Sequence, residues 1–325
     1  HLKEEDIESA MRRRHEAMQP PVWEIRSLKK RIGQLVLVIG VIAILAMLVW
    51  FFFFFRQKDT EKIFGIHANR YAKSVAFVLT EYWLTAGEIR IYQNRSEGTA
   101  FLVDRTGYLL TNRHVACPWL EDSNLNLQIR RRMNWQDPLQ LGYRVFLWFE
   151  GQKAFKRLPE LWESADLEDT YVLSSAFRTD GSPRLEIVGV ARVPDRTYQL
   201  IRSPLKDDFA VLKIDQVPEN LRPLPLDEKM EALAVPKLSP VITLGFPLGS
   251  RTQASTINVS VTRGHVRRTF ENLLQVDTSI HKGNSGGPII DTRGKVIGIA
   301  SGVAIDWIAG PMPVPTLLSD MGMVL

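Results

Sequence analysis

An uncharged run of 21 residues near the N-terminus constrains this chain more than any other feature. It extends from Leu35 to Phe55 and reads LVLVIGVIAILAMLVWFFFFF. At 1.5 Å per residue, a helix of this length crosses a bilayer core of about 30 Å. A core helix of a soluble domain normally carries a polar stripe, and a cleavable signal peptide has a shorter apolar core and small residues at its exit. The run has neither feature, so the sequence predicts a transmembrane helix over residues 34–56.

The charges that flank this run predict its orientation. Residues 1–33 form a strongly charged segment, read as helix with a break at Pro20-Pro21. The basic residues closest to the run on that side are Arg26, Lys29, Lys30 and Arg31. On the other side Lys and Arg are mixed with acids. Because Lys and Arg accumulate on the cytoplasmic side of a span, we expect a single-pass protein with residues 1–33 in the cytoplasm and the rest in the periplasm or at the cell surface.

The texture of the chain changes after a predicted polar linker over residues 57–70. Short β-like runs follow, divided by turn signals such as Asp180-Gly181. Many short strands at modest spacing favour an all-β sandwich or barrel, and residues 71–325 are predicted as one such domain. The predicted strands are Ser74–Leu79, Thr99–Val103, Arg144–Phe149, Leu185–Val193, Ala210–Ile214, Val241–Leu244, Ile257–Thr262 and Val296–Ala300.

Charge and cysteine content exclude several classes of protein. Cys117 is the one cysteine, so an intrachain disulfide and every cysteine-based zinc site are excluded. The six histidines are scattered and form no His-Glu-x-x-His pair, and we expect no metal or other cofactor. The net charge of +5 lies largely beside the apolar run and is a topology signal. We therefore expect no nucleic-acid partner and interpret Arg130-Arg131-Arg132 as a solvated loop.

Three local strings carry residues suited to nucleophilic acyl transfer. His114 follows the apolar run Leu109-Leu110, Asp207-Asp208 precedes Phe209-Ala210-Val211-Leu212, and Ser285 lies among glycines. Serine becomes a nucleophile when a neutral imidazole removes its proton, and a carboxylate holds that imidazole in one tautomer. Glycines beside the serine let backbone N–H groups turn toward a developing oxyanion.

The order of these residues along the chain is more informative than any one of them. Singly, each is commonly a turn, a cap or a surface residue. The order His, Asp, Ser differs from the other two common arrangements, Asp-His-Ser and Ser-Asp-His. The string around Ser285 is also no Gly-x-Ser-x-Gly elbow, because Gly287 is followed by Pro288 and a strand rather than by a helix.

From about Ser74 to the C-terminus, the chain resembles the trypsin-like, chymotrypsin-fold serine proteases, most closely those of the bacterial HtrA/Deg type. Seven strings spread over the domain carry the resemblance, which makes it far more specific than one motif. They are Gly98–Phe101, Gly107–Val115, Asp208–Lys213, Gly245–Gly249, Val261–Val266, Gly283–Pro288 and Gly294–Ile299.

The resemblance implies two six-stranded β-barrels with the site in the cleft between them, and hydrolysis of peptide bonds through an acyl-enzyme. His114 is then the general base and later the acid, and Asp208 rather than Asp207 orients it. Ser285 attacks the carbonyl, and the N–H groups of Gly283 and Ser285 form the oxyanion hole. The implied partners are protein or peptide substrates, and a homo-oligomer is left open. The implied substrate pocket consists of Ser279, Lys282, Ser301 and Gly302.

The chain departs from the Deg pattern at three places. His281-Lys282 stands where that type usually has Asn-Pro, and Lys282 borders the cleft. The interval between His114 and Asp208 is wide, which predicts an insertion around residues 118–200. This insertion is a decoration of the first barrel, a lid or a surface for a protein partner. No PDZ domain is expected after Ser285, and the absence of an acid at Ser279 favours a small or medium apolar side chain before the scissile bond.

Three other functions remain open from the sequence, one of them a membrane scaffold whose insertion over residues 118–200 recruits a partner while proteolysis is secondary. A catalytically silent trypsin-like fold could act as a membrane-tethered binding or scaffold module. A viral polyprotein protease could also follow a membrane segment. Labelling by a fluorophosphonate distinguishes an active serine enzyme from the silent fold, and the genomic neighbourhood distinguishes a bacterial from a viral protein.

Overall fold

The computed structural model describes most of the chain in two compact units, residues 1–62 and 63–325. The described residues are 8, 9, 11, 12, 14, 22–132, 137–156, 171–175, 184–191, 208–229, 231–270, 273–308 and 314–324. The predicted break at Pro20-Pro21 and the turn at Asp180-Gly181 lie outside them.

One helix, α2 (Val22–Tyr71), contains the apolar run. Within it Lys30–Phe51 has a mean hydropathy of 2.8 and no buried residue, so its length and composition suit a membrane span. Residues 57–70, expected as a linker, are the continuation of α2. This stretch has no proline, and Phe64, Ala68 and Tyr71 recur at helical spacing and bury one face.

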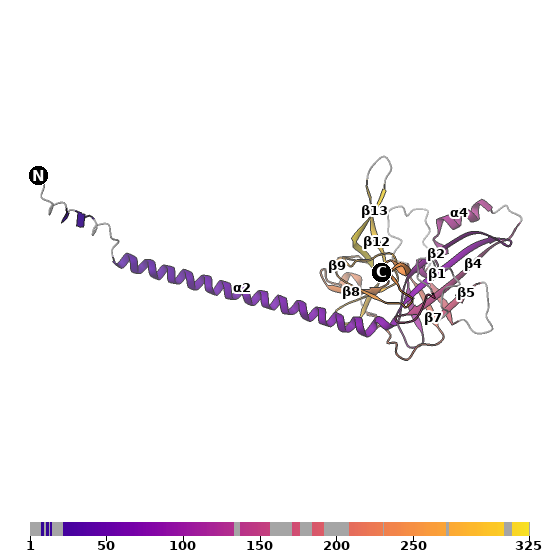
Figure 1. The fold of residues 1–325 in the computed structure, drawn as a ribbon, viewed down its shortest axis with the longest axis horizontal. Coiled ribbons are helices and arrows are strands. Elements are labelled where there is room, and N and C mark those ends of the chain that lie inside the picture. The colour runs from indigo at the N-terminus through magenta and orange to yellow at the C-terminus, as the bar shows by residue number, and fades with distance from the viewer. Residues whose placement is uncertain are drawn as a thin grey trace. The chain divides into compact units, whose positions relative to one another are not determined.

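The first half of the β unit is a seven-stranded antiparallel sheet (Figure 1). Its order is β5-β4-β1-β2-β3-β7-β6. Its strands are β1 (Val75–Ala86), β2 (Ile89–Leu102), β3 (Tyr108–Thr111), β4 (Leu139–Phe149), β5 (Tyr171–Ser174), β6 (Leu185–Val190) and β7 (Ala210–Ile214).

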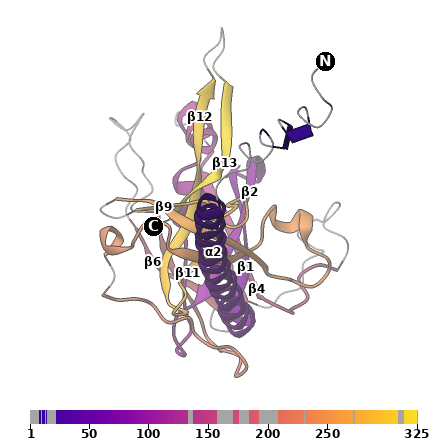
Figure 2. The same ribbon diagram turned by 90° about the vertical axis from the view of Figure 1, so that its left-hand side faces the viewer.

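The second half is a closed barrel of six strands in the order β10-β13-β12-β11-β8-β9. Figure 2 shows β12 and β13 side by side as a long hairpin. Its strands are β8 (Pro240–Gly245), β9 (Ser260–Thr269), β10 (Leu274–Val276), β11 (Pro288–Ile290), β12 (Val296–Ile308) and β13 (Val314–Val324).

In the described ranges, short helices lie before β1 or between the strands. They are the α-helices α3 (Arg113–Ala116) and α4 (Ser123–Arg132), and the 3₁₀ turns η1 (Ala72–Ser74), η2 (Pro118–Leu120), η7 (Ala232–Ala234) and η8 (Gly249–Thr252). The basic triplet Arg130-Arg131-Arg132, expected in a loop, is instead the last turn of α4. Basic side chains are favourable there because they face the negative end of the helix dipole.

Alternating side chains divide the core into layers. On β1, Ala76 and Val78 join the core inside the first sheet, whereas Phe77 faces a cluster shared with the second barrel. On β8, Val241 faces the interior of the second barrel and Ile242 the shared cluster. Because successive side chains of a strand point to opposite faces, strands buried on both sides join the two halves into one unit.

The prediction of an all-β, double-barrel domain preceded by an apolar helix is confirmed. The second barrel has the six predicted strands, but the first sheet has seven rather than six. The cause lies in the long interval 118–200, which contributes three strands, β4, β5 and β6. This interval is thus built into the sheet rather than lying wholly outside it.

Candidate active site

The pairing of β3 with β7 places His114 beside Asp208. The two strands are antiparallel, with Thr111 opposite Ala210. The chain leaving β3 and the chain entering β7 are therefore at the same end of the sheet. His114 lies on α3, three residues after Thr111, and Asp208 lies two residues before Ala210.

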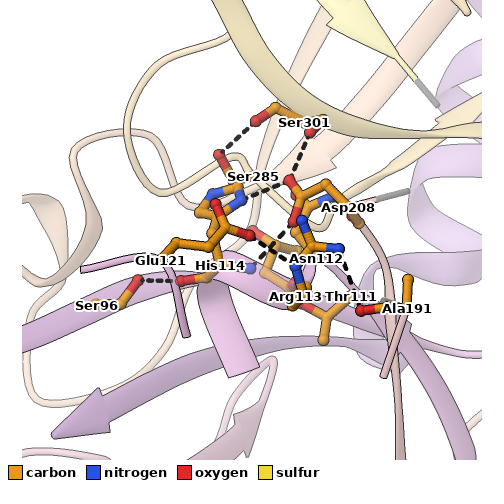
Figure 3. Close-up of polar contacts among 11 residues, drawn as sticks. Ser96, Thr111, Asn112, Arg113, His114, Glu121, Ala191, Asp208, Ser285 and Ser301 are labelled. Carbon is orange, nitrogen blue, oxygen red and sulfur yellow. Dashed lines mark hydrogen bonds and ion pairs between the residues drawn. The ribbon is translucent and has the colours of Figure 1, made fainter. Parts of the chain in front are cut away.

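His114 and Asp208 are joined by two hydrogen bonds (Figure 3). Nδ1 of His114 lies 2.6 Å from Oδ2 of Asp208, and the backbone N–H of His114 donates to Oδ1 at 3.1 Å. The imidazole side chain is 33% exposed and the carboxylate side chain 5% exposed. One edge of the ring is thus held by a buried acceptor while the side chain stays partly open to solvent.

Two further residues hold Asp208. The hydroxyl of Ser301, from β12, donates to Oδ2 at 2.8 Å, and the side-chain amide of Asn112 donates to the backbone carbonyl of Asp208 at 2.7 Å. Burial by itself would raise the pKa of Asp208. The hydrogen bond and charge of His114, with the bond from Ser301, outweigh burial and hold this pKa below its ordinary value. The carboxylate is therefore ionised at neutral pH.

The loop that carries Ser285 is fixed to β2 through Thr99. The hydroxyl of Thr99 donates to the carbonyl of Gly283 at 2.7 Å, and its N–H donates to the carbonyl of Ser285 at the same distance. Gly283 has a φ of 102°, and a Cβ there would lie 2.1 Å from the carbonyl oxygen of Phe246. A glycine is required at this position for both reasons.

Two carbonyl groups of this loop set the direction of two N–H groups. The carbonyl of Lys282 accepts from the N–H of Leu248 at 2.6 Å, and that of Asn284 accepts from Gly287 at 2.9 Å. The C=O and N–H of a trans peptide point in opposite directions, so the N–H groups of Gly283 and Ser285 point away from these partners. Within the described part of the chain, neither N–H donates to a protein acceptor.

The hydroxyl of Ser285 completes a network with the other two predicted catalytic residues. It donates to the carbonyl of Ser301 at 3.4 Å, and Ser301 in turn bonds Asp208 (Figure 3). No hydrogen bond joins Ser285 to His114 among the described residues. Such bonds are often long or misaligned in enzymes without substrate and tighten when it binds.

The four predicted pocket residues differ in their environment. Ser279 and Lys282 are exposed, Gly302 is half-buried and Ser301 is buried. Of these, the hydroxyl of Ser301 is bonded to Asp208, a contact that the sequence did not indicate. Thr99 and Asn112 were also missed. The sequence offered one signal for each: Thr99 directly follows Gly98, and Asn112 lies two residues before His114.

A buried thiol lies close to the site, three residues after His114. Burial raises the pKa of the Cys117 thiol to about 12, despite the nearby charge of Arg113, so this thiol is inert at neutral pH. In the described ranges, no group of three or more His, Cys, Asp or Glu side chains could hold a metal ion. Among the described residues, Ser285 is the candidate nucleophile, because its hydroxyl joins the network with Ser301 and Asp208.

Comparisons with known proteins agree with this geometry. A model of the trypsin-like peptidase domain matches residues 98–299, more than half of the chain. A probable periplasmic serine endoprotease, DegP-like, of Halomonas elongata is 33% identical over 135 residues, which are 41% of this chain and 27% of that protein.

Two more relatives are similar over comparable stretches. Protease Do-like 1, chloroplastic, of Arabidopsis thaliana is 34% identical over 30% of this chain and 22% of its own length. Serine protease Do-like HtrB of Bacillus subtilis is 30% identical over 42% of this chain and 30% of its own length. The predicted resemblance to the HtrA/Deg type is confirmed, although the matched stretch covers less than a third of each relative.

Proposed function

The chain belongs to the trypsin-like peptidase family, and from this premise we propose that it is a serine endopeptidase that hydrolyses peptide bonds with His114, Asp208 and Ser285. The observation that carries the proposal is the hydrogen-bonded network from Asp208 to His114 and through Ser301 to Ser285. It is supported by relatives that are named a serine endoprotease and a serine protease.

In this mechanism, His114 removes the proton of the Ser285 hydroxyl as Oγ attacks the carbonyl carbon of a peptide substrate. Asp208 accepts the Nδ1–H and so leaves the other ring nitrogen free to take the proton. Its negative charge also stabilises the imidazolium that forms. His114 then gives the proton to the leaving amine, and an acyl-enzyme remains on Ser285 until water hydrolyses it.

The N–H groups of Gly283 and Ser285 donate hydrogen bonds to the oxyanion of the tetrahedral intermediate and so stabilise its negative charge. Their orientation follows from the carbonyl bonds of Lys282 and Asn284. One such donor contributes about 3–4 kcal/mol to stabilisation of the transition state. The oxyanion hole thus lowers the activation barrier in addition to the effect of the triad.

Labelling with a fluorophosphonate tests the proposed activity. The full 325-residue chain in detergent micelles should react with the probe and cleave fluorescent casein, whereas Ser285→Ala should do neither. A wild type that stays unlabelled while correctly folded would favour the catalytically silent scaffold. Equal labelling of Ser285→Ala would place the nucleophile elsewhere.

We further propose that residues 34–56 anchor the enzyme in a membrane, with residues 1–33 in the cytoplasm and the peptidase unit outside it. The uncharged run, the unburied window Lys30–Phe51 and the basic residues before it support this topology. Carbonate extraction of membranes should leave the protein in the pellet. Protease added outside intact spheroplasts should digest a C-terminal tag and leave an N-terminal tag protected, and the reverse pattern would contradict the orientation.

A further inference from the structure

The backbone is strained at the turn Leu248–Ser250, where the chain from β8 enters η8. Leu248 has a φ of 65° and Gly249 a φ of 59°, so two consecutive residues adopt the left-handed conformation. For glycine this is inexpensive, but a bulky side chain such as that of Leu248 rarely occupies it. Strained residues persist where the surrounding structure determines them and gather at functional sites.

This turn controls one half of the oxyanion hole. The N–H of Leu248 donates to the carbonyl of Lys282 at 2.6 Å, and this bond directs the N–H of Gly283 the other way. Gly249 lies against the serine loop as well, because a Cβ on Gly283 would come within 2.7 Å of the Gly249 nitrogen. A change in the turn therefore reaches Gly283 through direct contacts.

Glu97, on β2, holds the turn from the other sheet. Its Oε2 accepts the N–H of Ser250 at 2.9 Å and its Oε1 accepts the Ser250 hydroxyl at 2.8 Å. A Cβ on Gly249 would lie 2.1 Å from Oε2, so the carboxylate is packed directly on the turn. Only 10% of the Glu97 side chain is exposed.

The place of Glu97 in the chain adds to this arrangement. Two residues farther along β2, Thr99 bonds the carbonyls of Gly283 and Ser285. One strand thus holds the serine loop directly through Thr99 and indirectly through Glu97 and the turn. Because the bonds from Ser250 end on a carboxylate, they are stronger than bonds between neutral groups.

We propose that Glu97 is a positioning residue for the oxyanion hole, holding the Leu248–Ser250 turn so that the N–H of Gly283 faces the substrate carbonyl. The inference rests on the proposed peptidase activity. It predicts that loss of the carboxylate slows the chemical step while leaving ground-state binding almost intact, since the hole is used fully only in the transition state.

The test is the concentration dependence of labelling by a fluorophosphonate, which yields a maximal rate and a half-saturating concentration separately. With the full chain in detergent micelles, Glu97→Ala should lower the maximal rate about 30-fold and change the half-saturating concentration less than about threefold. Glu97→Gln should stay within about threefold of wild type, because its amide can accept the Ser250 N–H and donate to the hydroxyl. Glu81→Ala, on neighbouring β1 and paired with Arg144, is the matched control and should behave as wild type.

Several outcomes would overturn the inference. One is an unchanged maximal rate in Glu97→Ala, another a loss confined to the half-saturating concentration, and a third an equal loss in folded Glu97→Gln. If Glu97→Ala does not fold, Ser250→Ala is the deciding variant. Its maximal labelling rate should fall about threefold, and an unchanged maximal rate would contradict the inference. A wild type that fails to react overturns the proposed function and this inference together, whereas a reactive wild type with an unaffected Glu97→Ala overturns the inference alone.

Discussion

His114 and Asp208 are held mainly through their own side chains, whereas the loop of Ser285 is held through its backbone carbonyl groups. On the first sheet, the Asp208 carboxylate accepts from His114 and Ser301. In the second barrel, the loop depends on carbonyl bonds and on Gly283 at a positive φ. The two halves of the site are thus held in place differently, one by bonds to side chains and the other by bonds to backbone carbonyl groups.

This difference predicts different responses to mutation. A side-chain network on the first sheet can be changed one atom at a time, since an isosteric residue keeps the volume and alters only the bonding. A backbone network has no such option, because any Cβ at Gly283 meets the carbonyl of Phe246. The first half should therefore show chemical effects without unfolding, and the second half should show both together.

The largest expected effect comes from Asp208→Asn. The amide keeps the shape but cannot both accept the Nδ1–H and stabilise an imidazolium, so kcat should fall about 10⁴-fold. Casein hydrolysis and the thermal midpoint measure the two effects, and the midpoint should change by only a few degrees. Asp207→Asn is the matched control and should leave kcat unchanged. The opposite result would assign the role to Asp207.

Gly283→Ala should combine a loss of activity with a loss of stability. We expect a fall in kcat of about 10²–10³-fold, as for removal of one oxyanion donor, and destabilisation by about 2–3 kcal/mol from the positive φ together with the clash of the new Cβ against the Phe246 carbonyl. Denaturant unfolding with activity assays measures both. Gly151→Ala is the control, because Gly151 has a φ of 83° but nothing within 4 Å of the added Cβ. Equal destabilisation by the two variants would show that the clash at Gly283 adds nothing.

Ser301→Ala should have a smaller effect, on chemistry more than on stability. It removes the hydroxyl that donates to Asp208 and leaves the carbonyl that accepts from Ser285. We expect kcat to fall about tenfold and stability by about 1 kcal/mol, as for loss of one hydrogen bond. An unchanged kcat with lower stability would make Ser301 a structural residue only.

The smallest expected effect is an acid-dependent loss of stability at Asp122, whose Oδ1 accepts the N–H groups of Asn124 and Leu125 and so caps α4. Burial would raise its pKa, but hydrogen bonds from Tyr82 and Tyr92 dominate and lower it to about 2. A depressed carboxyl pKa stabilises the fold fully above the unfolded value of about 4, and this contribution disappears as pH falls toward 2. Since Asp122 is partly exposed, we expect about 1 kcal/mol.

Urea unfolding between pH 7 and pH 2.5 tests this effect. Asp122→Asn should be less stable than wild type by about 1 kcal/mol at pH 7, and this difference should fall to about a third at pH 2.5. A difference independent of pH would assign the effect to packing. Such a result would weaken the view that hydrogen bonds to a side-chain carboxylate fix this half of the molecule.

Local patterns in the sequence predicted much of the fold. All eight predicted strands overlap observed ones, but their lengths were underestimated where polar residues enter a strand. Thr99–Val103 is the end of the long β2, and Val296–Ala300 is the start of β12. β13 (Val314–Val324) was missed, since VPTLLSDMGMV lacks a period of two and its strand form comes from pairing with β12 and β10.

The sequence alone determined the apolar run, the all-β texture and the order of His114, Asp208 and Ser285. These are properties of short stretches, which composition and spacing express without reference to the rest of the chain. The tertiary structure decided that Ser301 bonds Asp208 across 93 residues and that Thr99 bonds Gly283 across 184. It also decided that Glu97 holds the turn beside the oxyanion hole. Such contacts depend on how two sheets pack, and no local pattern encodes which distant side chains will meet.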